Sequence, residues 1–321
     1  MLAYFTALLR RSWRMFITVA KIMLPVMVLV QLAQHLGLVS VIGRLISPFM
    51  SVLNMPAEAG IIWATTVLVG IYGGIASLAG LAATIDMTTG QVSALCAMML
   101  FAHAIPVEQA IVRRAGASFA ATAALRIGTA AVYGAVISWG SHYSGLLSDP
   151  VSFDWLRGSS IMQANNGGVL PWLQSTAFSL ALTFLVIMGL AFALDMLERL
   201  GITRRFTAAM MPLLRLSGLD AHVAPVTTVG VLLGLTYGGA LIIEEAEKQK
   251  LSARTRFLAL SWLSLSHSLI EDTLLMMALG ADIWVVLVGR VLLTLAIVAT
   301  LAKLIWREDR SNPGQLSKQN A

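Results

Sequence analysis

The sequence predicts an all-α polytopic membrane protein, and both its composition and its internal symmetry support this prediction. Of its 321 residues, 58% are hydrophobic and 12% are charged, whereas an ordinary soluble domain has about 25% charged residues. A soluble fold this apolar would lack the polar side chains to cover its surface. A bilayer removes that requirement, because helices satisfy their own backbone hydrogen bonds in lipid.

The chain also repeats itself with a period of 164 residues. His103 and His267 are one such pair, and the same shift superposes other pairs of uncommon residues. These pairs are Gly37 with Gly201, Pro48 with Pro212, Gly70 with Gly234, Glu108 with Asp272, Gly116 with Gly280, and Arg126 with Arg290. A slip of one residue also aligns Tyr72-Gly73-Gly74 with Tyr237-Gly238-Gly239. The shared register indicates a duplication, and such repeats are typical of many transporter folds.

Both copies contain the same series of segments. Each series consists of an apolar segment, an amphipathic stretch, a Gly-rich apolar segment and two more apolar helices. In the first copy these are 18–36, 38–54, 58–85, 91–112 and 117–140. In the second copy they are 173–198, 202–217, 222–243, 257–278 and 282–305. Each apolar segment is near the length of about 20 residues that spans a bilayer. The predicted organisation is an interfacial amphipathic helix at 1–16, a first repeat at 17–140, an extracytoplasmic linker at 141–172, a second repeat at 173–306 and a cytoplasmic polar tail at 307–321.

The positions of the basic residues favour re-entrant hairpins for the two Gly-rich segments. With a cytoplasmic N-terminus and such hairpins, Arg113 and Arg114 lie inside and the basic-poor linker lies outside, as the positive-inside rule requires. If the Gly-rich segments instead cross the membrane as continuous helices, both placements are reversed. With hairpins, each copy crosses three times, so the repeats are inverted and both termini are cytoplasmic. In a bacterium the membrane would be the inner one.

The hairpin tips, GIYGGIAS and GLTYGGAL, provide the first candidate binding residues. Paired glycines permit the positive φ that a tight tip needs, and half-helix ends present partial charges to a solute. Tyrosine and threonine hydroxyls add hydrogen-bonding groups. The candidates are Tyr72, Gly73, Gly74, Tyr237, Gly238, Gly239, Thr65, Thr66, Thr227 and Thr228. The alternative is that these residues only pack helices together.

Ionisable residues within apolar segments form the second group of candidates. They are His103 and Glu108 in FAHAIPVEQ, and His267, Glu271 and Asp272 in LSHSLIEDT. Such groups are costly in a bilayer and usually face a cavity or a partner. We expect His267, Ser268 and Glu271 along one helix face, and a kink at Pro106. The group could bind a solute or relay protons. It could also hold a divalent cation through His103, Glu108, His267 and Glu271, or only tie helices together.

The matched arginines, Arg126 and Arg290, also lie within apolar runs. We expect each to neutralise Glu108 or Asp272, or to reach an interface, with anion binding as the alternative. No GxSxG, HExxH or Walker A sequence is present, so we predict no enzyme activity. The lone Cys96 cannot form an intrachain disulfide. Basic residues stand at the ends of apolar segments, which explains the net charge of +6 without nucleic-acid binding.

The YGG hairpins followed by histidine-plus-acid helices resemble the nucleoside-recognition, or Gate, superfamily. The resemblance covers about 20–140 and 175–305, so the chain is similar to two fused Gate units. That superfamily includes parts of concentrative nucleoside transporters, the membrane part of ferrous iron transporter B, and spore maturation proteins A and B. A single cysteine argues against an iron path. The resemblance implies a substrate site near the midplane of the membrane, between two opposed hairpins.

We therefore expect a secondary transporter, ion-coupled or facilitative, for a small polar solute that is nucleoside-like or a small organic ion. For ion-coupled transport the coupling ion would be H⁺ or Na⁺, and we expect no resident cofactor. One alternative is a divalent-cation permease, and another is a non-transporting membrane scaffold or sensor subunit. The expected partners are the lipid bilayer and the solute or ion, not nucleic acid. A homodimer is compatible with a bundle of about six crossings.

Overall fold

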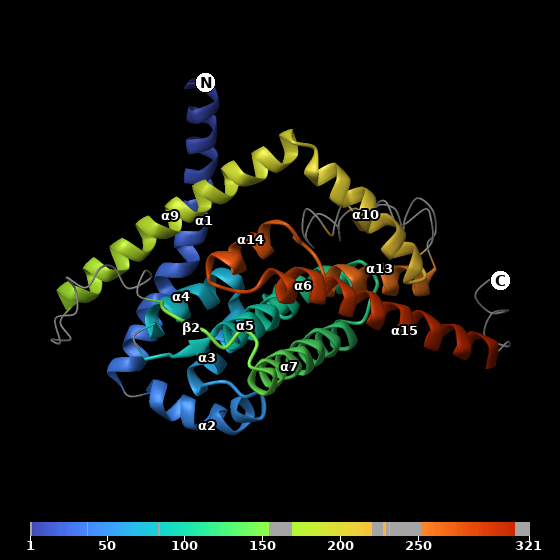
Figure 1. Ribbon diagram of the computed structural model, residues 1–321, viewed down its shortest axis with the longest axis horizontal. Coiled ribbons are helices and arrows are strands. Elements are labelled where there is room, and N and C mark those ends of the chain that lie inside the picture. Colours follow the sequence, from blue (N-terminus) through green and yellow to red (C-terminus); the bar gives the residue numbers. More distant parts are fainter. Residues whose placement is uncertain are drawn as a thin grey trace. The chain divides into compact units, whose positions relative to one another are not determined.

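The computed structural model describes residues 2–36, 38–82, 84–153, 169–219, 227–228, 231 and 252–311. In chain order its helices are α1 (Leu2–His35), α2 (Leu38–Val52), α3 (Ala57–Val69), α4 (Ile71–Leu81), α5 (Thr89–Phe101), α6 (Ile105–Arg114), α7 (Phe119–Ser144), α9 (Val169–Arg199), α10 (Ile202–Leu216), α13 (Ala253–Leu265), α14 (Glu271–Ala278), a π-helix (Trp284–Gly289) and α15 (Arg290–Ser311) (Figure 1).

The prediction of an all-α membrane protein is confirmed. Among the described residues, three helical stretches are long and apolar enough to cross a membrane, namely Thr89–Arg114, Phe119–Ser144 and Trp284–Leu304. The end of α2 and the whole of α3 make a fourth candidate, which is bent by 95°. The predicted total of six crossings stays a prediction.

The chain forms two compact units, each composed of three separate stretches. Unit 1 contains Met1–Ile105, Ile127–Arg199 and Glu271–Val286, and unit 2 contains Pro106–Arg126, Leu200–Ile270 and Leu287–Ala321. The core of unit 1 is α5, which is buried along almost its whole length, and α13 is buried in the same way in unit 2. Each unit therefore takes elements from both copies of the predicted repeat.

In unit 1, α1 packs on α9, and the two helices run antiparallel (Figure 1). Arg11, near the start of α1, forms an ion pair with Asp195 near the end of α9, with an N–O distance of 3.0 Å. The rings of Phe16 and Phe184 meet edge to face with centroids 5.4 Å apart. Helix α1 is continuous over 34 residues, so the segment 1–16 that we expected at the interface runs directly into the first apolar segment.

The first Gly-rich segment is broken into two short helices that pack against each other in unit 1. Helix α3 has 13 residues and α4 has 11, so they measure about 20 Å and 16 Å along their axes. The break is Gly70, with φ 123° and ψ 177°, a conformation that is nearly restricted to glycine. The alternative of one continuous helix through 58–85 is therefore wrong.

Several elements recur at the spacing of 164 residues. The bounds of α2 and α10 differ by 164 at both ends, and so do those of α5 and α13. Thr88 caps α5 by accepting a hydrogen bond from the Gln91 amide, and Ser252 caps α13 by accepting one from the Thr255 amide. A duplication predicts this recurrence of helix ends and of the side chains that cap them.

The structure adds a small sheet to the predicted helices, and some predicted segments lie outside the residues that it describes. Strands β1 (Met87–Thr88) and β2 (Pro150–Val151) form a two-stranded antiparallel sheet in unit 1, which the sequence pattern did not predict. Most of the linker (154–168), most of the second Gly-rich segment (220–226, 229–230 and 232–251) and the end of the tail (312–321) lie outside the described residues.

Candidate functional site

The two histidine-containing segments share one backbone conformation, which interrupts the helix. Ala102 has φ −134° and ψ 85°, and Ser266, its equivalent, has φ −143° and ψ 85°. Two residues later, Ala104 and Ser268 have positive φ of 44° and 48°. The interruption separates α5 from α6 and α13 from α14. Pro106 lies just inside α6 but has Ile270 as its counterpart, so proline is not the common cause of the break.

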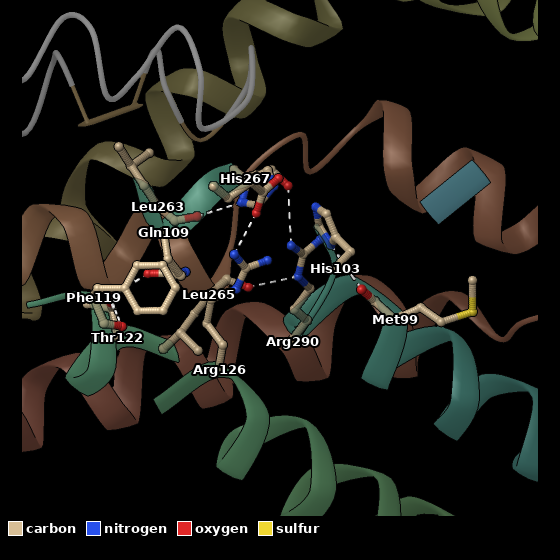
Figure 2. A network of polar contacts seen from close by, with 11 residues as sticks. Met99, His103, Gln109, Phe119, Thr122, Arg126, Leu263, Leu265, His267 and Arg290 are labelled. Atoms are coloured by element: carbon tan, nitrogen blue, oxygen red, sulfur yellow. Dashed lines mark hydrogen bonds and ion pairs between the residues drawn. The ribbon is translucent and has the colours of Figure 1, made fainter. Parts of the chain in front are cut away.

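Each histidine is oriented by the carbonyl four residues before it. The Nδ1 atom of His103 lies 2.9 Å from the Met99 oxygen, and that of His267 lies 2.6 Å from the Leu263 oxygen (Figure 2). A carbonyl can only accept, so Nδ1 carries the proton in both rings. In a neutral ring, Nε2 is then the basic nitrogen, which can take up a proton or bind a metal ion. Both side chains are buried.

The break also corrects one prediction. We expected His267, Ser268 and Glu271 on a single helix face, but α13 ends at Leu265 and α14 begins at Glu271. The spacing of four residues therefore does not place them on one face. Ser268, half-buried, takes the left-handed conformation within the break itself.

In unit 2, Glu108, the acid of the first copy, lies between Arg126 and His267, the histidine of the second copy. Arg126 donates a hydrogen bond to Oε2 of Glu108, which confirms the predicted ion pair. The other oxygen of Glu108, Oε1, lies 3.4 Å from Nε2 of His267. The Arg126 side chain is fully buried. The three side chains form one polar network at the break after α13.

Arg290 has a different role in the same unit. Its Nε donates to the Leu265 carbonyl at 3.0 Å, and its Nη2 donates to the His267 carbonyl at 3.3 Å (Figure 2). These carbonyls lose their helical partners where α13 stops. A buried guanidinium thus caps the broken helix and fixes the backbone of His267. The π-helix Trp284–Gly289 directly precedes Arg290 and changes the helical register just before it.

In unit 1, the histidine of the first copy lies near an acid of the second. A ring nitrogen of His103 and a carboxylate oxygen of Asp272 are within 4.8 Å of each other. His103 corresponds to His267, and Asp272 corresponds to Glu108, under the shift of 164. The histidine of each copy is therefore near the acid of the other copy, in His103 with Asp272 and in His267 with Glu108. The sequence alone did not show this reciprocal exchange.

The hairpin glycines do not act as we predicted. Gly73 and Gly74 lie within α4 and have no positive φ, so the turn is made by Gly70 alone. A Cβ at Gly74 would collide with the Thr66 hydroxyl and approach the Met99 methyl. Gly74 therefore allows α4 to pack closely on α3 and α5. The expectation that Gly73 and Gly74 supply the tip conformation is wrong, and Gly238 and Gly239 lie outside the described residues.

A backbone hydrogen bond also connects the hairpin of α3 and α4 to the break between α5 and α6. The amide of Ala104 donates to the Thr66 carbonyl at 3.0 Å, so the residue after His103 is fixed to the last turn of α3. The hydroxyls of Thr65 and Thr66 donate to carbonyls one turn earlier in α3, each at 2.8 Å. In this conformation those hydroxyls are satisfied within α3 itself.

The remaining candidates are placed as follows. Tyr72 is half-buried on α4, and Thr227 and Thr228 are buried. Tyr237, Gly238 and Gly239 lie outside the described residues. Sequence reasoning missed Gln109, which is buried in unit 2 and accepts a hydrogen bond from Thr122. Its position beside Glu108 in an apolar segment was the available signal.

Apolar helices interrupted at buried ionisable residues are a feature of membrane transport proteins, and this chain is an integral membrane protein. Residues 16–118 match the sequence profile of the Gate family, described as nucleoside recognition. That segment is therefore similar to the Gate family, in agreement with the predicted resemblance for the first copy. The family suggests a role related to membrane transport.

The chain is also similar to an uncharacterized membrane protein, YvoD, of Bacillus subtilis (strain 168). The two are 28% identical over 291 residues, which cover 89% of this chain and 91% of YvoD. The similarity therefore includes both copies of the repeat. No solved structure matches the chain.

Proposed function

We propose that the protein is a secondary transporter for a small polar solute, which binds near the midplane of the membrane at the broken helices. The observation that carries the proposal is the reciprocal pairing of His103 with Asp272 and of His267 with Glu108. Ionisable groups within membrane segments are costly, and those that are present usually pair with one another and mark a substrate or ion pathway. Oriented Nε2 atoms and carboxylates can bind a solute or exchange protons with it.

The orientation of the repeats supports this proposal. Helices α1 and α9 contain the first apolar segments of the two copies, and they run antiparallel with Arg11 beside Asp195. Equivalent helices of inverted repeats run in opposite directions, whereas those of parallel repeats run in the same direction. We infer that the copies are inverted, that both termini are cytoplasmic, and that the inner membrane is the location in a bacterium.

The dimensions of the first hairpin support a re-entrant segment. Its arms, α3 and α4, measure about 20 Å and 16 Å, whereas the hydrocarbon core is about 30 Å thick. Each arm thus reaches roughly the middle of the bilayer, where Gly70 turns the chain. We propose that the second Gly-rich segment forms the opposed hairpin.

Ligand-induced thermal stabilisation of the purified protein in detergent tests this function. A panel of nucleosides, amino acids, organic acids and divalent metal salts is compared for the unmodified chain and for His267→Ala. A ligand at about 100 times its Kd stabilises the folded state by roughly 2.7 kcal/mol. We expect an organic solute to stabilise the unmodified chain and to lose this effect in the variant.

Other outcomes of the panel have defined meanings. Stabilisation by Mn²⁺ or Zn²⁺ alone would favour the divalent-cation permease. Equal responses of the unmodified chain and His267→Ala to every ligand would contradict a site at the broken helices and favour the scaffold or sensor. The exposed Arg113, on α6, supplies the matched control, because Arg113→Ala should leave the response unchanged.

A further inference from the structure

The helix break of the second copy contains an acid that the first copy lacks. Glu271 has no acidic counterpart, because the shift of 164 places it on Val107. Glu108, the matched acid of the first copy, forms an ion pair with Arg126. Among the residues that the structure describes, none makes a hydrogen bond or an ion pair with the Glu271 side chain. Glu271 is therefore a carboxylate beside the helix break that the duplicated pattern does not account for.

The surroundings of Glu271 provide little compensation for a negative charge. Tyr72 from α4 lies close enough to interact electrostatically with it, and so does Arg11 from α1. Arg11 is half-exposed and already paired with Asp195 at 3.0 Å. The next residue, Asp272, is a second acid and lies within 4.8 Å of the His103 ring. Helices α4, α5 and α14 of unit 1 contain no lysine or arginine.

The first turn of α14 also contains a buried hydroxyl, that of Thr273, with unmet hydrogen-bonding capacity. The Thr273 side chain is 3% exposed, and its hydroxyl has no hydrogen-bond partner within the described ranges. Buried polar atoms normally find a partner in the protein, in water or in a ligand. The first turn of α14 thus holds a carboxylate with no hydrogen bond or ion pair to its side chain among the described residues and, two residues later, a buried hydroxyl without a partner there.

A carboxylate in apolar surroundings is stable only with a bound proton, a bound cation or a partner charge. Because Glu271 is only half-buried, an ion can reach it without unfolding. We propose that Glu271 holds the exchangeable coupling cation of the transport cycle, a proton or Na⁺. This proposal rests on the proposed function, but binding at Glu271 is measurable without any transported solute.

Reaction with dicyclohexylcarbodiimide tests the proposal, because this hydrophobic reagent modifies protonated carboxyl groups in apolar surroundings. The full chain in detergent is treated from pH 5.5 to 8.5 in choline chloride and then, at one pH, in NaCl. Peptide mass spectrometry compares Glu271 with the ion-paired Glu108. We expect Glu271 to react about tenfold faster, the ratio that one pH unit of proton affinity represents.

A proton site and a sodium site predict different labelling of Glu271. If Glu271 binds a proton, its labelling rate falls as pH rises and is the same in NaCl and in choline chloride. A sodium site predicts that NaCl slows labelling relative to choline chloride at constant pH. Labelling of Glu271 no faster than that of Glu108, or labelling that neither pH nor Na⁺ changes, overturns the proposal. Because these results need no substrate, a failure here is distinct from a failure of the proposed function.

Glu271→Gln provides an independent measurement by thermal unfolding. If the folded chain holds the cation at Glu271, the unmodified protein loses stability as pH rises in choline chloride, whereas the uncharged glutamine does not. For a sodium site, NaCl restores the stability of the unmodified protein only. The same pH and Na⁺ dependence in both proteins contradicts the proposal. Glu58→Gln is the matched control, since Glu58 lies in the first turn of α3 and should leave the dependence unchanged.

Discussion

Replacing Arg126 by leucine should destabilise the protein strongly, because it leaves Glu108 without its cation. The Arg126 side chain is 0% exposed and that of Glu108 is 14% exposed, so water cannot take over the lost interaction. Breaking a buried ion pair by removing one partner typically costs about 3–5 kcal/mol. His267, with Nε2 3.4 Å from Glu108, can offset part of this cost only by becoming protonated.

A double-mutant cycle separates the ion pair from the packing of the arginine side chain. Arg126→Leu, Glu108→Gln and the double variant are compared by thermal unfolding in detergent. At about 2 °C per kcal/mol, the single arginine variant should melt roughly 6–10 °C below the unmodified protein. The double variant should recover part of this loss, because it no longer buries an unpaired carboxylate.

Two results would refute this reasoning. Arg126→Leu could melt within about 1 °C of the exposed control Arg113→Ala, which should itself change stability by no more than about 0.5 kcal/mol. Alternatively, the double variant could be as unstable as the sum of the two single variants. Either result would show that the pair carries no coupling energy and that Glu108 is compensated by something else.

Three further variants test the backbone at the breaks by the same thermal assay. Gly70→Ala should cost about 1–3 kcal/mol because of its positive φ, whereas Gly128→Ala, which has open space around it, should be neutral or slightly stabilising. Ala104→Gly should stabilise the protein by about 1 kcal/mol, since it relieves a left-handed alanine, and a loss of stability would contradict that conformation. Arg290→Leu should cost about 1.5–3 kcal/mol for each of the two carbonyl hydrogen bonds that it removes, and an unchanged melting temperature would contradict the capping role.

Much of the fold follows from the sequence because hydrophobic length and duplication are local signals. The predicted stretches 38–54 and 202–217 correspond closely to α2 and α10. The ion pair of Arg126 with Glu108 was predictable because a charge in an apolar helix requires a partner. In contrast, a sheet with two residues in each strand is too short to produce a pattern.

The geometry of the breaks could not be read from the sequence. Nothing in an alanine indicates positive φ, so Ala104 gave no sign that the helix stops after His103. The spacing of His267 and Glu271 matched a helix face, but carbonyl capping by the distant Arg290 holds the chain in a different conformation there. Gly73 and Gly74 were assigned to the tip because glycine permits both turns and close packing, and only the packing partners distinguish the two roles.

Accessibility of the site from both sides of the membrane tests the transporter proposal most directly. In a Cys96→Ala background, Tyr72→Cys is reconstituted into vesicles and treated with a membrane-impermeant thiol reagent from one side at a time. Val132→Cys, on an exposed apolar position of α7, is the control that lipid should protect. Alternating access predicts labelling of Tyr72→Cys from each side in separate experiments. Labelling from one side only, or from neither, would contradict transport through this site.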